Sequence, residues 1–504
     1  MSAAPLAAAS TASGGRAKWG TLLTVGLGVV MVGLDGTVVS IANPAIGRSL
    51  HASLADLQWI TNAYLLALAV VLVPGGKLGD RYGRRLVFLT GVAGFTLSSV
   101  GVALSGSVAG AITMRTVQGV FGALLMPNTI ALVRAVFPPE ELNRAVGIWS
   151  SSSAAAVAGA PVIGGLLVEK VDWQSVFLIN VPIGIATVIC GLVVMPESRE
   201  SLRQRFDLPG LVLLAATMFC LVYGVIHSET AGWASATSIA LLCGSVLLGG
   251  AFAAVELRHP APLLPMHLLA SRSISLGVVT LLLNFFALYG VLFFVSLYFQ
   301  NVQHLDAIQA GIRLLPLIGI FSVASPYAGR VTTRFGARIP ITVGLALSTA
   351  SLLGMLGIGT GSSFWSLCPS LIGIGMGVAL VVVASTEAII ASAPVDEAGL
   401  AGGLQGIAMQ LGGVLGSSVI GSVLAARVSA VLPHPFPLPR AVVEQGAVLP
   451  GTSPAVAATA HAAFLSGLHL ALVFGALATL VGAACGPFVR ADLSEVTERP
   501  ALVV

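Results

Sequence analysis

The sequence predicts an all-α polytopic membrane protein, and three observations support this fold class. Of the 504 residues, 56% are hydrophobic and only 9% are charged, whereas about 25% of residues are charged in soluble domains. The hydrophobic residues form repeated runs of about 20, the length that a helix needs to cross the hydrocarbon core. The 59 glycines suit the close packing of helices in lipid, where small residues let backbones approach.

Fourteen such runs follow one another along the chain, and each predicts one transmembrane helix. The connection between the third and fourth runs is short, so this division is the least distinct. The predicted spans are residues 19–42, 57–75, 86–105, 109–136, 145–168, 174–195, 208–227, 236–256, 273–300, 309–328, 339–358, 364–391, 403–426 and 462–487.

The distribution of basic residues predicts the orientation of these helices. If the helices alternate in direction, 18 of the 24 Lys and Arg residues lie on the same side as the two termini, and four lie on the other side. Cytoplasmic segments carry the excess of Lys and Arg, so we expect both termini to be cytoplasmic. The bias towards Ala, Gly and Arg indicates a bacterial genome, and the expected location is its cytoplasmic membrane.

Several kinds of site are absent from the sequence. The five cysteines lie in hydrophobic runs without a CxxC pair, which is typical of small buried residues rather than metal ligands. Gly76 and Lys77 are followed by Leu78, so no phosphate-binding loop forms. We therefore predict no enzyme activity, no cofactor and no metal. The net charge of +4 is spread over short loops, which argues against a nucleic-acid partner.

The chain contains an internal repeat. Residues 76–85 and 329–338 share Gly, Arg, Gly and Arg in register, and both segments follow the second helix of a six-helix unit. Internally repeated bundles with a binding site between them are the usual architecture of secondary transporters. Asp35 and Arg115 have no ionisable counterpart in the second unit, so the first unit holds charges that the second lacks.

The repeat and the spans together predict two six-helix bundles with a helix pair inserted between them. The longest loop, residues 427–461, is then external and, being rich in proline, is expected to be extended. The predicted divisions are a cytoplasmic N-terminal tail (1–18), a first bundle (19–195), a cytoplasmic linker (196–207), the inserted pair (208–256), a second bundle (273–487) and a cytoplasmic tail (488–504).

Four motifs carry a resemblance to a known family. Their residues are Leu34, Asp35, Thr37, Val38 and Val39; Gly76, Leu78, Asp80, Arg81, Gly83, Arg84 and Arg85; Arg115, Gln118 and Gly119; and Ala156, Ala160, Pro161, Gly164 and Gly165. The second group resembles the signature loop of the major facilitator superfamily, and the others resemble motifs of its fourteen-span drug:proton antiporters. Ala156 and Ala160 depart from the glycines that this family prefers. The resemblance covers nearly the whole chain and implies the major facilitator fold.

Asp35 and Arg115 are the candidates for proton coupling. A carboxylate inside a membrane span is costly and is by default a functional candidate. Asp35 is therefore a proton or cation site, or else a structural carboxylate that braces the first helix. Arginine stays charged and needs a partner, and Asp35 is the available acid at a comparable depth. The expected role of Arg115 is to modulate proton release; the alternatives are a fixed ion pair or a side chain that snorkels to the interface.

The first signature segment is a candidate cytoplasmic latch. It places Asp80 among basic residues, so ion pairs could form in one conformation and break in another. The alternative, an ordinary excess of cytoplasmic positive charge, explains the arginines but not Asp80. The predicted latch residues are Gly76, Asp80, Arg81, Gly83, Arg84 and Arg85.

The remaining candidates lie within spans. Proline and glycines in the antiporter motif would kink a helix and let it pack closely, as a hinge or as plain packing. Glu387 is a possible second charge site, or else it snorkels to the interface. The predicted antiporter-motif residues are Gly159, Pro161, Gly164 and Gly165, and the candidate cavity-lining residues are Gln118, Asn284 and Tyr289.

These features predict a proton-coupled antiporter that exports small, mostly lipophilic molecules by alternating access. Its expected partners are a small-molecule substrate, protons and the lipid bilayer, and it is expected to act as a monomer. Two alternatives remain open at this point. The first is dedicated export of one endogenous metabolite or lipid. The second is a membrane sensor or scaffold that binds a ligand without transporting it.

Overall fold

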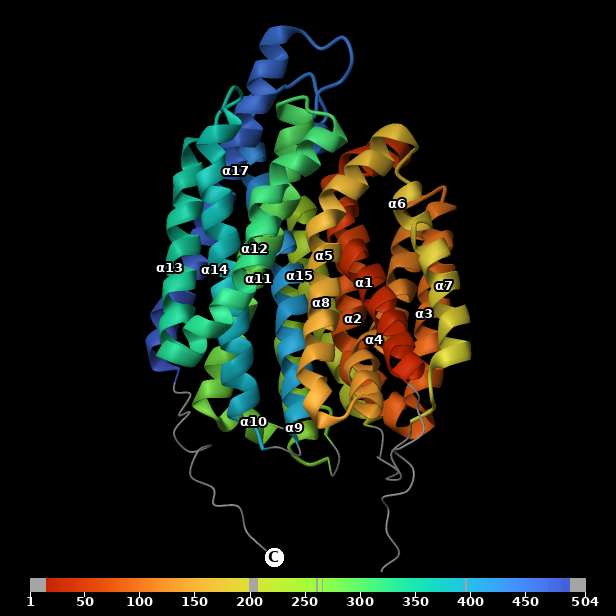
Figure 1. Ribbon diagram of the computed structural model, residues 1–504. Helices are drawn as coiled ribbons and strands as arrows, with labels where there is room; N and C mark the ends of the chain where they lie inside the picture. Colours follow the sequence, from red (N-terminus) through yellow and green to blue (C-terminus); the bar gives the residue numbers. More distant parts are fainter. Residues whose placement is uncertain (1–14, 199–206, 260–261, 265, 395–396, 490–504) are drawn as a thin grey trace, which may run out of the picture.

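The computed structural model describes residues 15–198, 207–259, 262–264, 266–394 and 397–489, and these residues form an array of long helices without strands (Figure 1). Fourteen helices in this part of the chain are long and apolar enough to cross a membrane. This number confirms the prediction from the hydrophobic runs.

Most spans consist of a single helix. The long helices are α1 (Gly15–Leu50), α2 (Leu54–Tyr82), α3 (Arg84–Ala103), α4 (Val108–Val136), α5 (Pro139–Lys170), α7 (Asn180–Val194), α8 (Leu208–Ala231), α9 (Ala236–Glu256), α11 (Arg272–Leu297), α12 (Ala307–Phe335), α13 (Arg338–Gly354), α14 (Phe364–Ala391), α15 (Ala398–Val431) and α17 (Pro454–Cys485). The short helices are α6 (Ser175–Leu178), α10 (Met266–Ala270) and α16 (Arg440–Val443).

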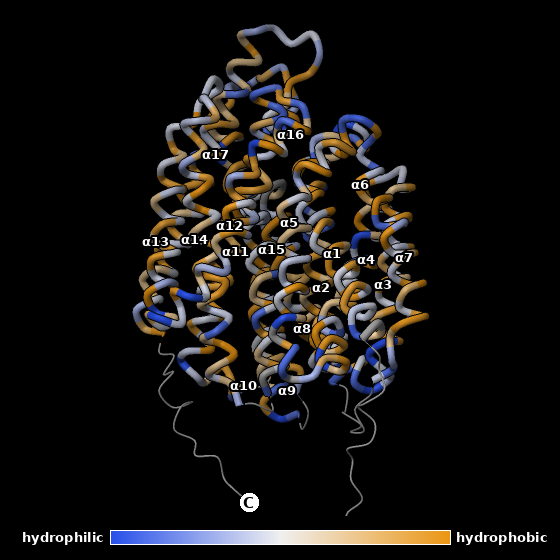
Figure 2. Tube along the Cα trace, viewed as in Figure 1, coloured by the Kyte–Doolittle hydropathy of each residue, from blue (hydrophilic) through white to orange (hydrophobic). Residues whose placement is uncertain are grey.

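The helices alternate in direction, so α1 begins and α17 ends on one face of the array (Figure 1). We call this face the terminal face. The opposite face, where residues 432–453 connect α15 to α17, is the loop face. Hydrophilic residues gather towards these two faces, and the middle of the array is mostly hydrophobic (Figure 2). An apolar belt between two polar ends is what a bilayer requires.

The helices form two groups that pack mainly within themselves. In the first group, α1 packs on α5 and α7, and α4 packs on α2 and α3. In the second group, α11 packs on α15, α14 packs on α12 and α13, and α17 packs on α13 and α15. The groups meet where α5 contacts α12 and α2 contacts α15. Helix α8 packs on α9, α2 and α15, so the inserted pair lies beside the α2–α15 junction.

Local sequence signals explain where several helices begin and end. Ser53 Oγ accepts a hydrogen bond from the backbone N–H of Asp56, and the backbone N–H of Ser53 donates to Asp56 Oδ2, which together form the capping box that starts α2. Asp306 caps α12 in the same manner through Gln309 N. Gly83 separates α2 from α3 with φ at +114°, a conformation that glycine adopts without strain.

The structure corrects several predicted boundaries. The first helix continues through Pro44 to Leu50, because neighbouring helices can compensate for a proline in a membrane helix. The predicted span 174–195 is divided after Leu178: Pro182 lacks an N–H and its ring opposes the carbonyl four residues earlier, so the helix restarts at Asn180.

The predicted external loop 427–461 is shorter than expected. Helix α15 runs to Val431, α17 starts at Pro454, and the intervening segment contains α16 instead of being wholly extended. This segment packs back on the first bundle, where Gln445 Nε2 donates to the carbonyl of Ala52 at 3.0 Å. Residues 199–206 of the predicted linker, and most of both predicted tails, lie outside the described residues.

Candidate functional site

The first bundle encloses an ion pair between α1 and α4. Arg115 Nη1 donates to Asp35 Oδ2 at 2.5 Å, and the two side chains are 1% and 0% exposed. Gln118 Nε2 donates to Asp35 Oδ1 at 2.8 Å. Both carboxylate oxygens are therefore occupied by donors from α4. The acid and the arginine that the sequence singled out are brought into direct contact.

Other helices hold the arginine in place. Its Nε donates to the carbonyl of Ile60 on α2 at 3.1 Å. The guanidinium carbon lies 4.2 Å from the centre of the Tyr64 ring and 5.6 Å from that of Phe177. Aromatic faces attract cations, so these rings offset part of the cost of burying the positive charge. These contacts of Arg115 do not involve Asp35.

The network extends from the ion pair to α3 and α7. Gln118 Nε2 also donates to Ser99 Oγ at 2.8 Å, and Asn180 Nδ2 donates to the same oxygen at 3.2 Å. A buried polar network whose members are bonded to one another is rigid. Protonation of Asp35 would remove the negative charge from the middle of this network. The geometry therefore allows proton binding to alter the packing of four helices at once.

The signature segment lies at the terminal face and is more helical than predicted. Residues 76–82 are the last turns of α2, so Asp80 is on a helix and not on a loop. Only Gly83 breaks the chain, because α3 starts at the next residue. The positive φ of Gly83 disfavours larger residues at this position. Gly76 is an ordinary helical residue that faces Pro127.

The charged residues of this segment are already paired. Arg84 Nη2 donates to Asp80 Oδ1 at 2.8 Å. Arg85 Nη2 donates to the carbonyl of Leu192 at 2.7 Å, which ties α3 to α7. The guanidinium of Arg81 lies over the ring of Tyr82. The geometry provides an ion pair that a conformational change could break, and the latch role itself stays a prediction.

Replacing Asp80 with Asn is expected to slow export more than it weakens substrate binding. The change removes the ion pair with Arg84 but touches no residue of the Asp35 network. Initial export rate and binding affinity should be measured for the same substrate. Asp56→Asn, at the other end of α2, is the matched control and should leave the rate unchanged. An Asp80→Asn rate equal to that of the wild type would contradict the latch.

Two of the antiporter-motif residues, Pro161 and Gly165, lie where the two bundles touch. A Cβ on Gly165 would lie 2.4 Å from the carbonyl oxygen of Ala307, and a Cβ on Gly311 would lie 2.2 Å from that of Pro161. These two glycines let α5 and α12 approach backbone to backbone. Gly164 instead faces Val38 of α1, within its own bundle. A Cβ on Gly159 would meet only Ile163, at 3.4 Å.

Two hydrogen bonds between the bundles lie near the loop face. Ser296 Oγ donates to the carbonyl of Ser40 at 2.7 Å, and Gln300 Nε2 donates to that of Ile41 at 3.1 Å. These contacts join α11 and the turn after it to α1. Together with the α5–α12 contact, they close the loop-face end of the bundle interface.

The second junction contains a polar contact that the sequence did not predict. Asn62 on α2 bonds to Ser417 and Ser418 on α15, at 2.7 Å and 2.9 Å. All three side chains are buried. The sequence feature that could have predicted this contact is an asparagine, Asn62, inside an apolar span, since such residues usually form hydrogen bonds across helices.

The other sequence candidates have varied environments. Gln118, predicted to line a cavity, lies in the buried network instead. Asn284 is 1% exposed, and neither amide atom has a hydrogen-bond partner. Tyr289 reaches across from α11 towards Gly36 of α1, with its hydroxyl 3.9 Å from a Cβ placed there. Glu387 is half-buried near the terminal-face end of α14, and its role as a second charge site stays a prediction.

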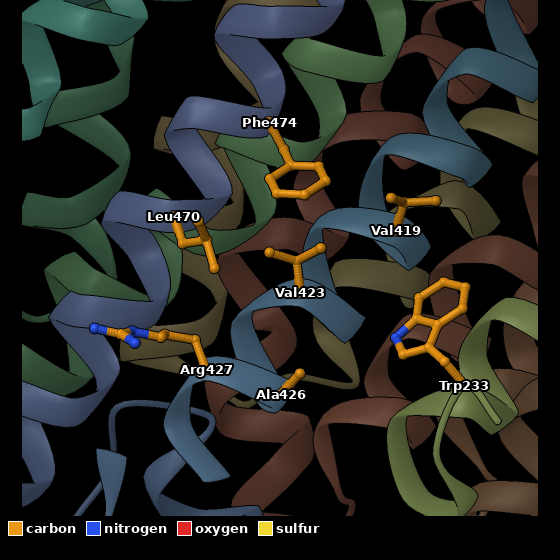
Figure 3. A pocket seen from close by; sticks show the side chains of 7 residues that line it. All are labelled: Trp233, Val419, Val423, Ala426, Arg427, Leu470 and Phe474. Atoms are coloured by element: carbon orange, nitrogen blue, oxygen red, sulfur yellow. The ribbon is translucent and has the colours of Figure 1, made fainter. Parts of the chain in front are cut away.

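Two apolar grooves open on the outside of the array. One, of about 440 Å³, lies between Trp233 and the side chains of α15 and α17; Figure 3 shows its Arg427 directed away from Trp233. The other, of about 590 Å³, runs between α2, α4 and α8 beside Phe219 and Tyr223. Neither groove includes a residue of the Asp35 network.

Within the described residues, no three His, Cys, Asp or Glu side chains gather as a metal site.

Comparison with known proteins decides the family. The family model described as Major Facilitator Superfamily matches residues 25–417, which cover most of the first bundle, the inserted pair, and the second bundle as far as the middle of α15. The chain belongs to the major facilitator superfamily. Its fold is accordingly the major facilitator fold, with two pseudo-repeated six-helix bundles and an inserted pair.

Relatives within this superfamily include proteins named for resistance and export. The chain is 45% identical to the tetracenomycin C resistance and export protein of Streptomyces glaucescens, over 95% of this chain and 93% of that protein. It is 35% identical to the multidrug resistance protein Stp of Mycobacterium tuberculosis, over 84% of this chain and 80% of that one. It is 30% identical to the multidrug efflux pump LfrA of Mycolicibacterium smegmatis, over 92% and 95%.

A solved structure supports the fold alone. A bacterial homologue of the human lysosomal transporter Spinster, in an inward-facing and unoccupied conformation, superposes with a TM-score of 0.62. The match covers 94% of this chain and 99% of the other at 17% sequence identity. The membrane-protein prediction is therefore confirmed at the level of fold.

Proposed function

We propose that the protein exports small, mostly lipophilic molecules, such as drugs and antibiotics, across the cytoplasmic membrane in exchange for protons. The observation that carries this proposal is the buried Asp35–Arg115 pair in a superfamily transporter. Export as the direction of transport is supported by the relatives named for resistance, export and efflux. No catalytic group is needed for this activity.

The proposed cycle uses the charge of Asp35. A proton that arrives from the external side neutralises the carboxylate and removes its Coulombic attraction to Arg115. Arginine remains charged, so its other contacts, to Ile60, Gln118 and the Tyr64 ring, then dominate its position. The bundles rock between conformations, and substrate leaves when the loop face is open. Release of the proton to the cytoplasm restores the pair.

The proposed orientation places the terminal face in the cytoplasm. It is supported by the excess of Lys and Arg on that side of the chain. The contacts at the loop face then describe a conformation closed to the outside. We further propose that the protein acts as a monomer, with substrate, protons and lipid as its only partners.

Replacing Asp35 with Asn is expected to abolish proton-driven export while the protein still inserts. Asparagine keeps the size of the side chain and removes the titratable charge. The measurement is uptake of a fluorescent lipophilic cation into inside-out vesicles under an imposed proton gradient, with and without an uncoupler. Normal gradient-driven uptake by Asp35→Asn would refute the assignment of coupling to this residue.

The same assay separates the alternatives. No uptake by correctly inserted wild type would point to a narrower, non-cationic substrate, such as one endogenous metabolite or lipid. A panel of competing compounds tests this directly, because broad competition indicates multidrug export and a single competitor indicates a dedicated exporter. A sensor or scaffold would bind a ligand specifically and show no flux with any compound.

A further inference from the structure

Two carboxyl groups meet at the terminal-face end of the inserted pair. Asp207 caps α8, and its Oδ1 accepts a hydrogen bond from Gly210 N at 2.8 Å. Glu256 ends α9, and its Oε2 accepts one from Leu264 N at 3.0 Å. Their residues are 0% and 3% exposed. Each acid thus uses one oxygen to bind a backbone N–H.

The second oxygen of each acid faces the other acid. A Cβ placed on Gly210 would lie 2.4 Å from Glu256 Oε1 and 2.5 Å from Asp207 Oδ2, so both oxygens border the same point. Neither has a hydrogen-bond donor. A buried oxygen without a donor is costly, and two such oxygens border the same point here. A single proton between them would satisfy both.

Electrostatics leads to the same conclusion. Two carboxylates that share a buried position cannot both ionise easily, and such a pair takes up protons as one unit. The nearby cationic groups do not remove this constraint. His259 Nδ1 is 3.7 Å from Asp207 Oδ2. Lys77 of α2 is attracted electrostatically by both acids, and its Nζ donates a hydrogen bond to the carbonyl of Pro262 at 2.8 Å.

The other charged groups on the neighbouring elements are engaged elsewhere. On α2, Asp80 pairs with Arg84. On α15, which packs against α8, Glu397 pairs with His267 of α10 at 2.7 Å, and Arg427 bonds to a serine of α17 near the loop face. Lys77 and His259 are charged or titratable groups among the described residues that interact with the two acids.

We propose that Asp207 and Glu256 form a second proton-binding site, in which the two carboxyl groups hold one proton between them. Lys77 belongs to the signature segment of α2, and Pro262 belongs to the connection from α9 to the second bundle. Loss of the shared proton gives the pair a second negative charge and draws Lys77 more strongly. The protonation state of the site then regulates how firmly α2 is held to the inserted pair. A role of this regulation in export rests on the proposed function.

The proton itself can be observed by infrared difference spectroscopy. The full-length protein in lipid nanodiscs should be titrated with H⁺ alone, in H₂O and D₂O, while the C=O stretching band of protonated carboxyl groups is followed. In wild type we expect such a band at neutral pH that disappears as the pH is raised. Glu256→Gln and Asp207→Asn should each abolish it, since the acid that remains ionises alone.

The variants are chosen so that they fold. Gln and Asn keep an oxygen for the backbone N–H, and their amide N–H can donate to the remaining acid as the shared proton would. Asp306→Asn is the matched control, because Asp306 caps α12 through Gln309 N at 2.7 Å in the way that Asp207 caps α8. The control should retain the band.

The outcomes separate this site from the Asp35 site. The band should persist in Asp35→Asn, whether or not that variant transports. Persistence of the band in both Glu256→Gln and Asp207→Asn, its absence from wild type, or its loss in Asp35→Asn would each overturn the proposal. Failure of proton-driven export would overturn the proposed function but would leave the spectrum of the acid pair unchanged.

Discussion

Replacing Arg115 with Gln is expected to destabilise the protein more than replacing Arg115 and Asp35 together with Gln and Asn. The single change leaves the Asp35 carboxylate, whose side chain is 0% exposed, with Gln118 as its remaining donor. Removing one partner of a buried ion pair costs about 3–5 kcal/mol, because an uncompensated charge remains. The double variant contains two neutral amides that can bond to each other.

Thermal unfolding of the purified variants, followed at neutral and acidic pH, measures this difference. The single variant should unfold at a lower temperature at neutral pH and regain stability as acid protonates Asp35. The double variant should not show this recovery. The control is Arg313→Gln, because Arg313 is a partly buried span arginine whose Nη1 bonds to a neutral partner, Gln303 Oε1. Equal stability of the single and double Arg115 variants would show that the pair contributes little.

The sequence predicted the ion pair because of the cost of burying charge. An acid and an arginine inside apolar runs each need a partner in lipid, and only one partner of opposite charge was available at that depth. It indicated that Gln118 could supply a hydrogen bond, but not that Gln118 bonds to both members of the pair. A glutamine can donate and accept, so its partners depend on the angles between helices, which the sequence does not specify.

The acid pair was missed for a different reason. Asp207 and Glu256 stand at the ends of hydrophobic runs, where a charged residue ordinarily faces water. Glu256 is buried where Leu264 N donates to its Oε2, beside Leu263 and Leu264, which are only 1% and 7% exposed. Hydropathy predicts spans well, since lipid demands about 20 apolar residues, but it does not show which connections cover the helix ends.

The repeat predicted which helices correspond, and the glycine contacts show its physical basis. Gly159 aligns with Gly412 at the repeat offset, and the helices that contain them, α5 and α15, both pack on the first helix of their own bundle. On α15, a Cβ on Gly412 or Gly416 would strike the backbone carbonyl of Leu282 or Phe286. The same helices also form the two junctions between bundles, a dual role that only the structure shows.

This dual role makes the α5–α12 junction sensitive to one methyl group, and Gly311→Ala is expected to reduce export by about tenfold or more. The added Cβ would lie 2.2 Å from the carbonyl oxygen of Pro161, and backbone atoms cannot move aside as a flexible side chain can. Overpacking typically costs about 1–3 kcal/mol, and 1.4 kcal/mol corresponds to a tenfold change in an equilibrium. The added methyl group destabilises the conformation that is closed at the loop face, because α5 and α12 touch there. The equilibrium therefore shifts towards the open conformation.

The accessibility of the loop face distinguishes a shift towards the open conformation from simple misfolding. The reporter is a Ser40→Cys variant, which is labelled with a membrane-impermeant maleimide added from the loop-face side. The reporter that also carries Gly311→Ala should be labelled faster than the reporter alone. Gly319→Ala is the matched control, since Gly319 lies two turns further along α12 and a Cβ there meets nothing within 4 Å. Wild-type export by Gly311→Ala would mean that α5 and α12 need not touch this closely during the cycle. Slower export with unchanged labelling would assign the defect to the open state instead.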